Sequence, residues 1–204
     1  MNPDYGPCIT PAADPLALFA SWLAQAQTSE INDPNAMALA TVGADGQPSV
    51  RMVLLKDYDT RGFTFYTNTE SHKGQQLAQQ PRAALLFHWK SLRRQVRVEG
   101  AVQPVSTTEA DAYFAARPRM AQVGAWASAQ SRPLASREEL TQAVQATEAR
   151  FNEQDVPRPP HWSGYRIIPA QIEFWQEQGF RLHDRVVYTR PQPEGHWTHA
   201  RCYP

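Results

Sequence analysis

A short segment near the C-terminus gathers the residues best suited to chemistry. Gln171 to Arg185 reads QIEFWQEQGFRLHDR, with a tryptophan, two arginines, a histidine and an aspartate close together. The apolar residues before Glu177 and the run from Arg181 onward predict two short strands, and Glu177 to Gly179 predicts the turn between them. The segment is therefore expected to form a hairpin that carries several charged side chains.

The expected second strand of this hairpin would place its charges on one side. Side chains alternate along a strand, so Arg181, His183 and Arg185 would share one face. Two permanent cations beside one titratable imidazole suit an anionic, planar ligand. The alternative is a solvated edge strand whose charges discourage aggregation.

A second candidate is the predicted start of a helix at Ser71-His72-Lys73. The free N–H groups and positive dipole of a helix N-terminus favour phosphate, and Ser71 and Lys73 would add a hydroxyl and a charge. Simple capping of the helix by Ser71 explains the same residues.

Tyr113 and Arg117 form a third candidate. They lie four residues apart and would share a face of a predicted helix, where a phenol and a guanidinium can hold one phosphate together. A solvated pair on a helix surface is the alternative. A fourth stretch, Arg51 to Lys56, reads as a buried strand with a cation at each end, and strict alternation puts those two cations on opposite faces.

Composition limits the class of protein. The 204 residues contain 20 Lys plus Arg and 20 Asp plus Glu, so the absence of a basic excess argues against a general nucleic-acid binder. Cys8 and Cys202 form no disulfide framework, which favours a reducing compartment. The N-terminus does not resemble a signal peptide, and no apolar run approaches the roughly 20 residues that span a bilayer. A cytoplasmic protein with no membrane partner is expected.

The spacing of His196, His199 and Cys202 does not suit a zinc site, and no metal is expected.

The elements that would position these residues alternate between strands and helices. Proline-rich residues 1–13 predict a mobile N-terminal arm, and residues 14–204 predict a single domain. Helices are expected from Asp14, from Ser71 to Gln80, through Tyr113 and over Leu140 to Phe151, with a stiff connector at 155–160. Strands are expected at 37–42, 49–56, 63–67, 83–89 and 95–102, the first three as an antiparallel meander. The pattern predicts an α+β fold with a barrel-like antiparallel sheet.

The C-terminal motif also carries a resemblance. Glu173-Phe174-Trp175-Gln176, followed after a short gap by Arg181-Leu182-His183-Asp184-Arg185, resembles the signature of the pyridoxamine (pyridoxine) 5′-phosphate oxidases. The similarity runs from about Asp14 to Pro204. It implies an antiparallel six-stranded split β-barrel with surrounding helices, and a homodimer that holds FMN at the subunit interface.

The resemblance also implies site residues and an activity. It implies that FMN is contacted by Arg51, Met52, Val53, Leu54, Leu55, Lys56, Tyr66, Thr67, His72, Lys73, Gln95, Gln130, Ser131, Trp175 and Arg185. It implies that the substrate is held by Lys56, Tyr113, Arg117, Arg181, Leu182 and His183, with Arg181 and His183 catalytic. The implied reaction oxidises pyridoxamine or pyridoxine 5′-phosphate to pyridoxal 5′-phosphate with O2, releasing H2O2, and ammonia from the amine.

Three departures from the family pattern concern binding. His72 stands where relatives usually have arginine, and Ala121 stands where a serine usually contacts the substrate phosphate. The arm is short, and only Tyr5 could cover the substrate. The departures leave two alternatives: an FMN-dependent oxidase of another aromatic substrate such as a phenazine precursor, or a non-catalytic split barrel that binds flavin or a B6 vitamer.

Overall fold

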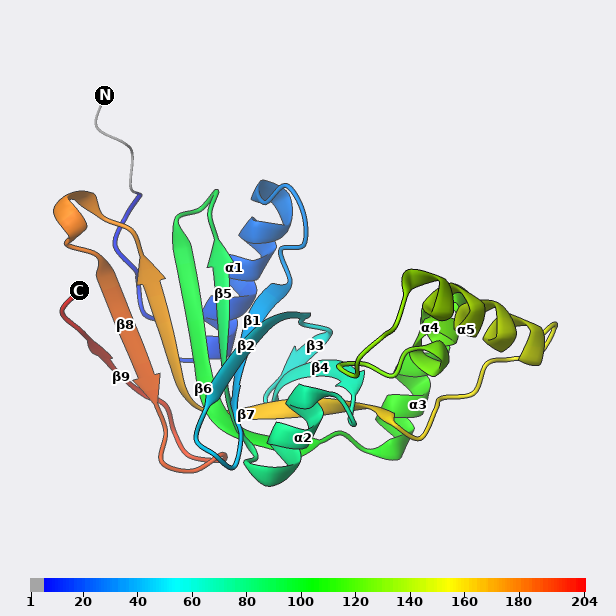
Figure 1. Ribbon diagram of the computed structural model, residues 1–204. Helices are drawn as coiled ribbons and strands as arrows, with labels where there is room; N and C mark the ends of the chain where they lie inside the picture. The colour runs from blue at the N-terminus through cyan, green and yellow to red at the C-terminus, as the bar shows by residue number, and fades with distance from the viewer. Residues whose placement is uncertain (1–5) are drawn as a thin grey trace.

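The computed structural model describes residues 6–204 and shows one curled antiparallel sheet with helices around it (Figure 1). The helices are α1 (Pro15–Ser29), α2 (His72–Gln79), α3 (Thr107–Ala115), α4 (Arg119–Ala127) and α5 (Arg137–Arg150), with a 3₁₀ turn η1 (Gly179–Arg181). The strands are β1 (Ala36–Val42), β2 (Pro48–Leu54), β3 (Asp57–Asp59), β4 (Gly62–Asn68), β5 (Arg82–Trp89), β6 (Arg94–Pro104), β7 (Trp162–Gln176), β8 (Asp184–Thr189) and β9 (Thr198–Arg201).

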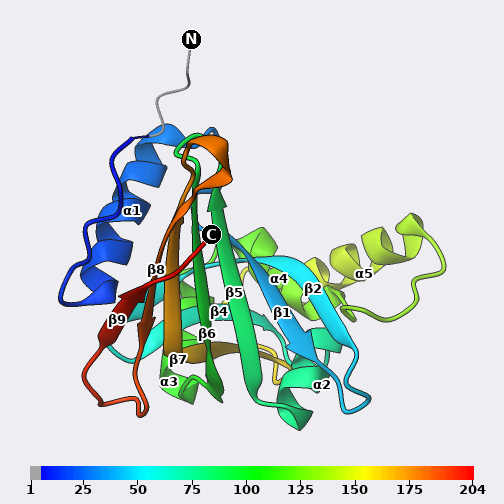
Figure 2. The ribbon, with the colours of Figure 1, turned by 90° about the vertical axis from the view of Figure 1, so that its left-hand side faces the viewer.

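The sheet runs in the order β2-β1-β5-β6-β7-β4-β3, and β8 pairs with both β7 and β9. β7 is the longest strand and has different neighbours along its length on one side: its first half pairs with β4 and its second half with β8. A register shift between Glu99 and Gly100 interrupts its pairing with β6. A bulge of this kind bends a strand and increases its twist, which fits the curl seen in Figure 2.

Aromatic side chains fill the main core between α1 and the sheet. Phe19 of α1 meets Phe63 and Phe87 edge-on, with ring centroids 4.9 and 5.1 Å apart. A second core joins α3, α4 and the start of β7, where Phe114, Val123 and Trp162 are buried. In Figure 1, helices α3, α4 and α5 stand together, away from α1. The α+β class with a curled antiparallel sheet is confirmed, although residues 6–204 contain nine strands where six were expected.

Two helix starts confirm the capping predictions. Ser106 and Glu109 form a reciprocal capping box at α3, and Ser71 caps α2 by accepting a hydrogen bond from the Gly74 N–H. Residues 155–160 contain neither helix nor strand, as their prolines predict.

The C-terminal hairpin differs from the prediction. β7 continues to Gln176, and β8 begins only at Asp184. Arg181 lies in the turn η1 with a φ of 62°, so strand alternation does not place it on the face of Arg185. The reason is that the connection needs two consecutive residues with positive φ, Phe180 and Arg181, a conformation that no local sequence signal indicated.

The predicted meander of three strands is also wrong. β2 pairs with β1, but β4 pairs with β3 and β7, because β3 forms its own short hairpin with β4. β2 is not buried on both faces either: Met52 is 63% exposed and Val50 69% exposed. Its apolar composition therefore does not reflect burial within one chain.

Part of the arm that was predicted to be mobile contacts the domain. The Ile9 N–H donates to the Asp184 carboxylate at 2.6 Å, and Arg201 donates to the Ile9 carbonyl oxygen at 3.1 Å. The Ile9 side chain is buried in the main core. Tyr5 lies outside the described residues. Across residues 6–204, no helix combines the length and apolar character needed to cross a membrane.

Candidate functional site

Three of the residues expected to contact the flavin form a row across the sheet. Gln95 of β6 faces Trp175 of β7, and Trp175 faces Arg185 of β8. Directly paired residues on neighbouring strands point to the same side of a sheet. The row therefore presents an amide, an indole and a guanidinium from three strands on one face.

A buried carboxylate fixes one end of this row. Glu173 is 3% exposed, and Arg185 donates to it through Nε at 2.8 Å and through a second nitrogen at 3.0 Å. Arg97 pairs with the same carboxylate. Burial acts to raise the pKa of Glu173, but the hydrogen bonds from Arg185 and Arg97 outweigh it and hold the pKa below its ordinary value. Glu173 was not among the predicted site residues, although an acidic side chain between apolar Ile172 and Phe174 is a signal that it needs a cationic partner.

Two cations meet at the start of α2 without an acidic partner. Lys73 Nζ donates to Gln130 at 2.9 Å and to the Thr67 hydroxyl at 3.1 Å, and Arg51 donates to the Thr41 hydroxyl at 2.5 Å. Within residues 6–204, neither cation forms an ion pair. Burial lowers the pKa of both, and the charge of Arg51 lowers that of Lys73 further. Two partly buried positive charges that lack a carboxylate favour an anion at this position.

Other residues that were expected to contact the flavin differ in their exposure and in their contacts. His72, the first residue of α2, lies 3.3 Å from the Ser49 hydroxyl through Nε2. Ser131 is exposed and has a φ of 72°. Along β2 and just beyond it, Met52 and Leu54 are exposed, Val53 is half-buried, and Leu55 packs in the main core. The Leu55 side chain consequently points away from the site, which leaves only its backbone for a ligand.

The three residues expected to hold the substrate phosphate line one cavity of about 350 Å³. Lys56, Tyr113 and Arg117 all border it, together with Ala121. Their convergence does not follow from a shared helix face, because α3 ends at Ala115 and Arg117 lies in the loop that follows. One terminal nitrogen of Arg117 is buried without a hydrogen-bond partner, and burial lowers the pKa of this guanidinium. The Arg117 guanidinium at the cavity wall thus keeps unused hydrogen-bonding capacity, and charged N–H groups of this kind favour an anionic oxygen.

Tyr66 was expected at the flavin, but its ring borders this same cavity. It stacks on Tyr113 with centroids 4.0 Å apart and on Trp162 with centroids 5.3 Å apart. Burial raises the pKa of the Tyr66 phenol, and the charges of Glu109 and Asp57 add to the effect. The phenol thus stays protonated and available as a hydrogen-bond donor.

Arg181, Leu182 and His183 lie elsewhere. Leu182 and His183 border a separate cavity of about 710 Å³ that also contains Cys8 and Cys202. The His183 ring lies 4.7 Å from the Trp175 ring, and its Nδ1 accepts a hydrogen bond from the Gln178 N–H. One chain therefore brings His183 next to the Gln95–Trp175–Arg185 row, but not into the cavity of Arg117.

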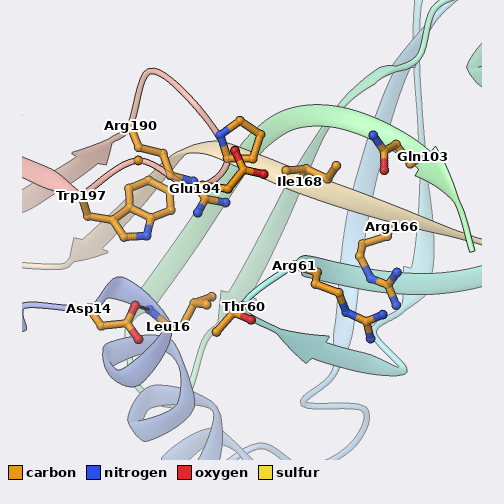
Figure 3. A pocket seen from close by; sticks show the side chains of 12 residues that line it. Asp14, Leu16, Thr60, Arg61, Gln103, Arg166, Ile168, Arg190, Glu194 and Trp197 are labelled. Carbon is orange, nitrogen blue, oxygen red and sulfur yellow. Dashed lines mark hydrogen bonds between the residues drawn. The ribbon is translucent and has the colours of Figure 1, made fainter.

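Another cavity, of about 670 Å³, contains none of the predicted residues (Figure 3). Arg190 and Trp197 lie at one end and Arg61 and Arg166 at the other. These arginines already have partners: Arg61 and Arg166 pair with Glu109, and Arg190 donates to the Pro169 carbonyl oxygen at 2.8 Å. Arg61 and Arg166 thus have their counter-charge in Glu109, whereas Arg190, which lies over the Trp197 ring, forms no ion pair within residues 6–204. The nearby charges of Glu194 and Asp14 favour its charged form.

Two protein-family models match the chain. A model described as "Pyridoxamine 5'-phosphate oxidase" matches residues 23–151. A second, described as "Pyridoxine 5'-phosphate oxidase C-terminal dimerisation region", matches residues 162–204. Together they include every strand from β1 to β9.

Curated relatives are similar over almost the whole chain. A protein of Azorhizobium caulinodans named "Pyridoxine/pyridoxamine 5'-phosphate oxidase" is 61% identical over 203 residues, covering 100% of this chain and 96% of the relative. A protein of Brucella canis with the same name is 62% identical over 195 residues, covering 96% of each.

Solved structures show the same architecture. PhzG from Burkholderia lata 383, determined in complex with tetrahydrophenazine-1-carboxylic acid, is 32% identical with a TM-score of 0.89, covering 100% of this chain and 98% of that one. A pyridoxamine 5'-phosphate oxidase-related, FMN binding protein from Nostoc punctiforme is 18% identical with a TM-score of 0.73, covering 96% of this chain and 100% of that one. At that identity the second likeness supports the fold alone.

Proposed function

Because this chain belongs to the pyridoxamine 5′-phosphate oxidase family, we propose that it oxidises pyridoxamine or pyridoxine 5′-phosphate to pyridoxal 5′-phosphate. O2 accepts the electrons and leaves as H2O2, and the amine substrate also releases ammonia. The structural observation that supports this reaction is the pair of cationic sites, one at Arg51 and Lys73 and one at Lys56 and Arg117. A phosphorylated cofactor and a phosphorylated substrate require two such sites.

The cofactor that fits the first site is FMN. Arg51, Lys73 and the Thr67 hydroxyl would hold its phosphate, and His72 at the start of α2 lies close enough to add a donor. Gln95, Trp175 and Arg185 would contact the flavin ring, with Gln130 and Ser131 as further polar contacts. When bound, FMN supplies a ring that accepts a hydride equivalent from C4′ of the substrate.

The substrate phosphate fits the second site. Lys56, Tyr113 and the guanidinium of Arg117 would hold it, and the phenol of Tyr66 offers a further donor. Arg181 and His183 would hold the pyridine ring so that C4′ lies against the flavin. The alanine at position 121 removes one hydroxyl from this cavity.

A homodimer would complete the site. In one chain, His183 and Arg117 border different cavities, so we place Arg51, Lys73, Lys56 and Arg117 on one subunit and the Trp175 row with His183 on its partner. Two observations support an assembly: the dimerisation region matched over residues 162–204, and the exposed apolar side chains of β2.

Anaerobic reduction tests the substrate. The purified flavoprotein is mixed with pyridoxine 5′-phosphate without oxygen, and the oxidised flavin absorbance should bleach and return with H2O2 when air is admitted. Unphosphorylated pyridoxine at the same concentration serves as the control. A flavoprotein that keeps its absorbance with the phosphorylated substrate contradicts the assignment.

The similarity to PhzG raises oxidation of a phenazine precursor as the second candidate. The Arg117→Ala variant separates the two. Loss of charge-assisted hydrogen bonds worth roughly 1.5–3 kcal/mol each should lower kcat/KM for pyridoxine 5′-phosphate by about 10- to 100-fold. A kcat/KM that is unchanged in Arg117→Ala supports oxidation of a phenazine precursor. Binding of a vitamer without any H2O2 production supports a non-catalytic binding protein.

A further inference from the structure

Three near-parallel aromatic rings form one wall of the cavity that contains Arg117. Tyr66 from β4, Tyr113 from α3 and Trp162 at the start of β7 lie with their planes within 10° of one another. Gly164 makes room for the stack, because a Cβ there would lie 2.6 Å from the Tyr66 ring. Segments far apart in the sequence thus build this wall together.

Arg117 depends on this wall for its position. It lies in the loop after α3, where no helical backbone fixes it, and within residues 6–204 it forms no ion pair. Its guanidinium carbon lies 4.8 Å from the centroid of Trp162 and 5.6 Å from that of Phe114. A ring face holds a guanidinium by cation–π attraction while leaving its N–H groups free.

Trp162 is itself held rigidly. It is 6% exposed, and Phe114 meets it edge-on with centroids 5.0 Å apart and planes at 72°. Its pairing partner on β4 is Asn68, so the sheet fixes the Trp162 backbone as well. A rigid support transmits its position to the side chain that rests on it.

We propose that Trp162 is the positioning residue of the phosphate site, holding the Arg117 guanidinium at the cavity wall so that its N–H groups meet the substrate phosphate. This inference rests on the proposed function. A carboxylate would fix Arg117 equally well but would compete with the phosphate for the same N–H groups. The indole face orients the cation without occupying its donors.

The test compares Trp162→Leu and Trp162→Phe with the wild-type holoenzyme. Steady-state kinetics with pyridoxine 5′-phosphate give kcat and KM, and inhibition by inorganic phosphate reports the anion site directly. Loss of the cation–π support should raise KM roughly tenfold in Trp162→Leu, weaken phosphate inhibition by a similar factor and leave kcat nearly unchanged. Trp162→Phe should lie between, with KM raised about two- to threefold.

A readout without turnover accompanies the kinetics. Inorganic phosphate should raise the melting temperature of the wild-type protein, and this protection should shrink in Trp162→Leu, because ligand binding stabilises the folded state. In the Arg117→Ala background, Trp162→Leu should change neither KM nor phosphate inhibition further, since a positioning residue has nothing left to position.

Trp126→Leu is the matched control. Arg150 lies over the Trp126 ring at 4.8 Å, the same separation as Arg117 from Trp162, but neither Trp126 nor Arg150 borders the Arg117 cavity. Trp126 packs in the same second core, against Phe151. Its loss should lower the melting temperature and leave KM and phosphate inhibition at wild-type values.

The outcomes separate the inference from the function on which it rests. Suppose that the wild-type protein turns over pyridoxine 5′-phosphate, and that Trp162→Leu has a lower melting temperature but an unchanged KM and unchanged phosphate inhibition. Trp162 would then only pack the core, and the proposal would be wrong. If Trp162→Leu does not fold, an unchanged KM in Trp162→Phe overturns the proposal instead. A wild-type protein that neither turns over pyridoxine 5′-phosphate nor responds to phosphate refutes the proposed function itself.

Discussion

At the scale of single residues, ion pairing distinguishes two groups of cations. Arg61, Arg166 and Arg185 all pair with carboxylates and stabilise the fold. Within residues 6–204, Arg117 and Lys73 form no ion pair and instead contact rings or neutral oxygens, although both are partly buried. Leaving such charges without a carboxylate costs stability, and that cost is explained when the missing counter-charge arrives with a ligand.

Glu109 illustrates the stabilising group. Its carboxylate accepts from Arg166 at 2.7 Å and from Arg61, and also from the Ser106 N–H within the capping box of α3. The hydrogen bond from Arg166, followed by that from Ser106, lowers the pKa of Glu109 to about 2. A lowered pKa means that the ionised carboxylate stabilises the fold more than the unfolded chain.

The Glu109→Gln variant should therefore show a pH-dependent loss of stability. The contribution of Glu109 is fully present above its ordinary pKa of 4.5 and is lost as the pH falls toward about 2. Urea unfolding at pH 7 should give a lower midpoint for the variant than for the wild type, and the difference should shrink between pH 4.5 and pH 2. A difference that persists unchanged at pH 2 would assign the effect to packing.

At the scale of elements, β7 connects the two halves of the proposed site. Its first residue, Trp162, lies beneath the Arg117 guanidinium. Near its other end, strand pairing places Trp175 between Gln95 and Arg185. Between these ends, Glu173 anchors Arg185 from the same face as Trp175. In the proposed site, a single strand of 15 residues thus carries supports for both anion binding and ring binding.

Glu173→Gln tests the middle of this strand. The amide keeps the shape of the carboxylate but loses its charge, so Arg185 and Arg97 lose charge-assisted hydrogen bonds worth roughly 1.5–3 kcal/mol each. We expect weaker FMN binding, by roughly tenfold, and a lower free energy of unfolding of the protein without FMN. Quenching of FMN fluorescence and chemical denaturation measure the two effects.

Glu99→Gln is the control for this substitution. It removes the same charge, but Glu99 lies at an exposed position on β6. It should leave both FMN affinity and stability near wild-type values. Normal FMN affinity in Glu173→Gln would show that Arg185 reaches the flavin without this anchor.

At the scale of the whole molecule, the residues of the proposed site lie on two surfaces. Arg117 and Lys56 border one cavity and His183 another, and the exposed apolar residues of β2 lie next to Lys56 in the sequence. Contact between two copies of the chain would cover these apolar side chains and join the two sets of residues.

Subunit mixing tests this division. Arg117→Ala and His183→Ala should each be weakly active alone, but a mixed dimer would contain one site with both defects and one intact site. Random mixing of the two variant chains in equal amounts gives mixed dimers in half of the cases. About a quarter of all sites should therefore be intact. Dissociation and reassociation of differently tagged chains, followed by the peroxide assay, measures the recovery. Activity that stays at the level of the single variants would place all these residues within one subunit's site.

Local sequence determined much of this protein. The helix caps at Ser71 and Ser106, the break at 155–160 and most strands were predicted, because hydrogen bonds and backbone restrictions between near neighbours set them. The motif around Trp175 and Arg185 indicated the family, since those residue types occur at fixed spacing along the chain.

Only the tertiary structure decided how the site is built. No local signal paired β4 with β7, gave Phe180 and Arg181 positive φ, or put Trp162 beneath Arg117. The same holds for the anchoring of Arg185 by Glu173. These relationships join residues whose distance in the sequence carries no information about their distance in space. They form because the long curled sheet buries apolar surface in one register only, and that register brings the side chains together.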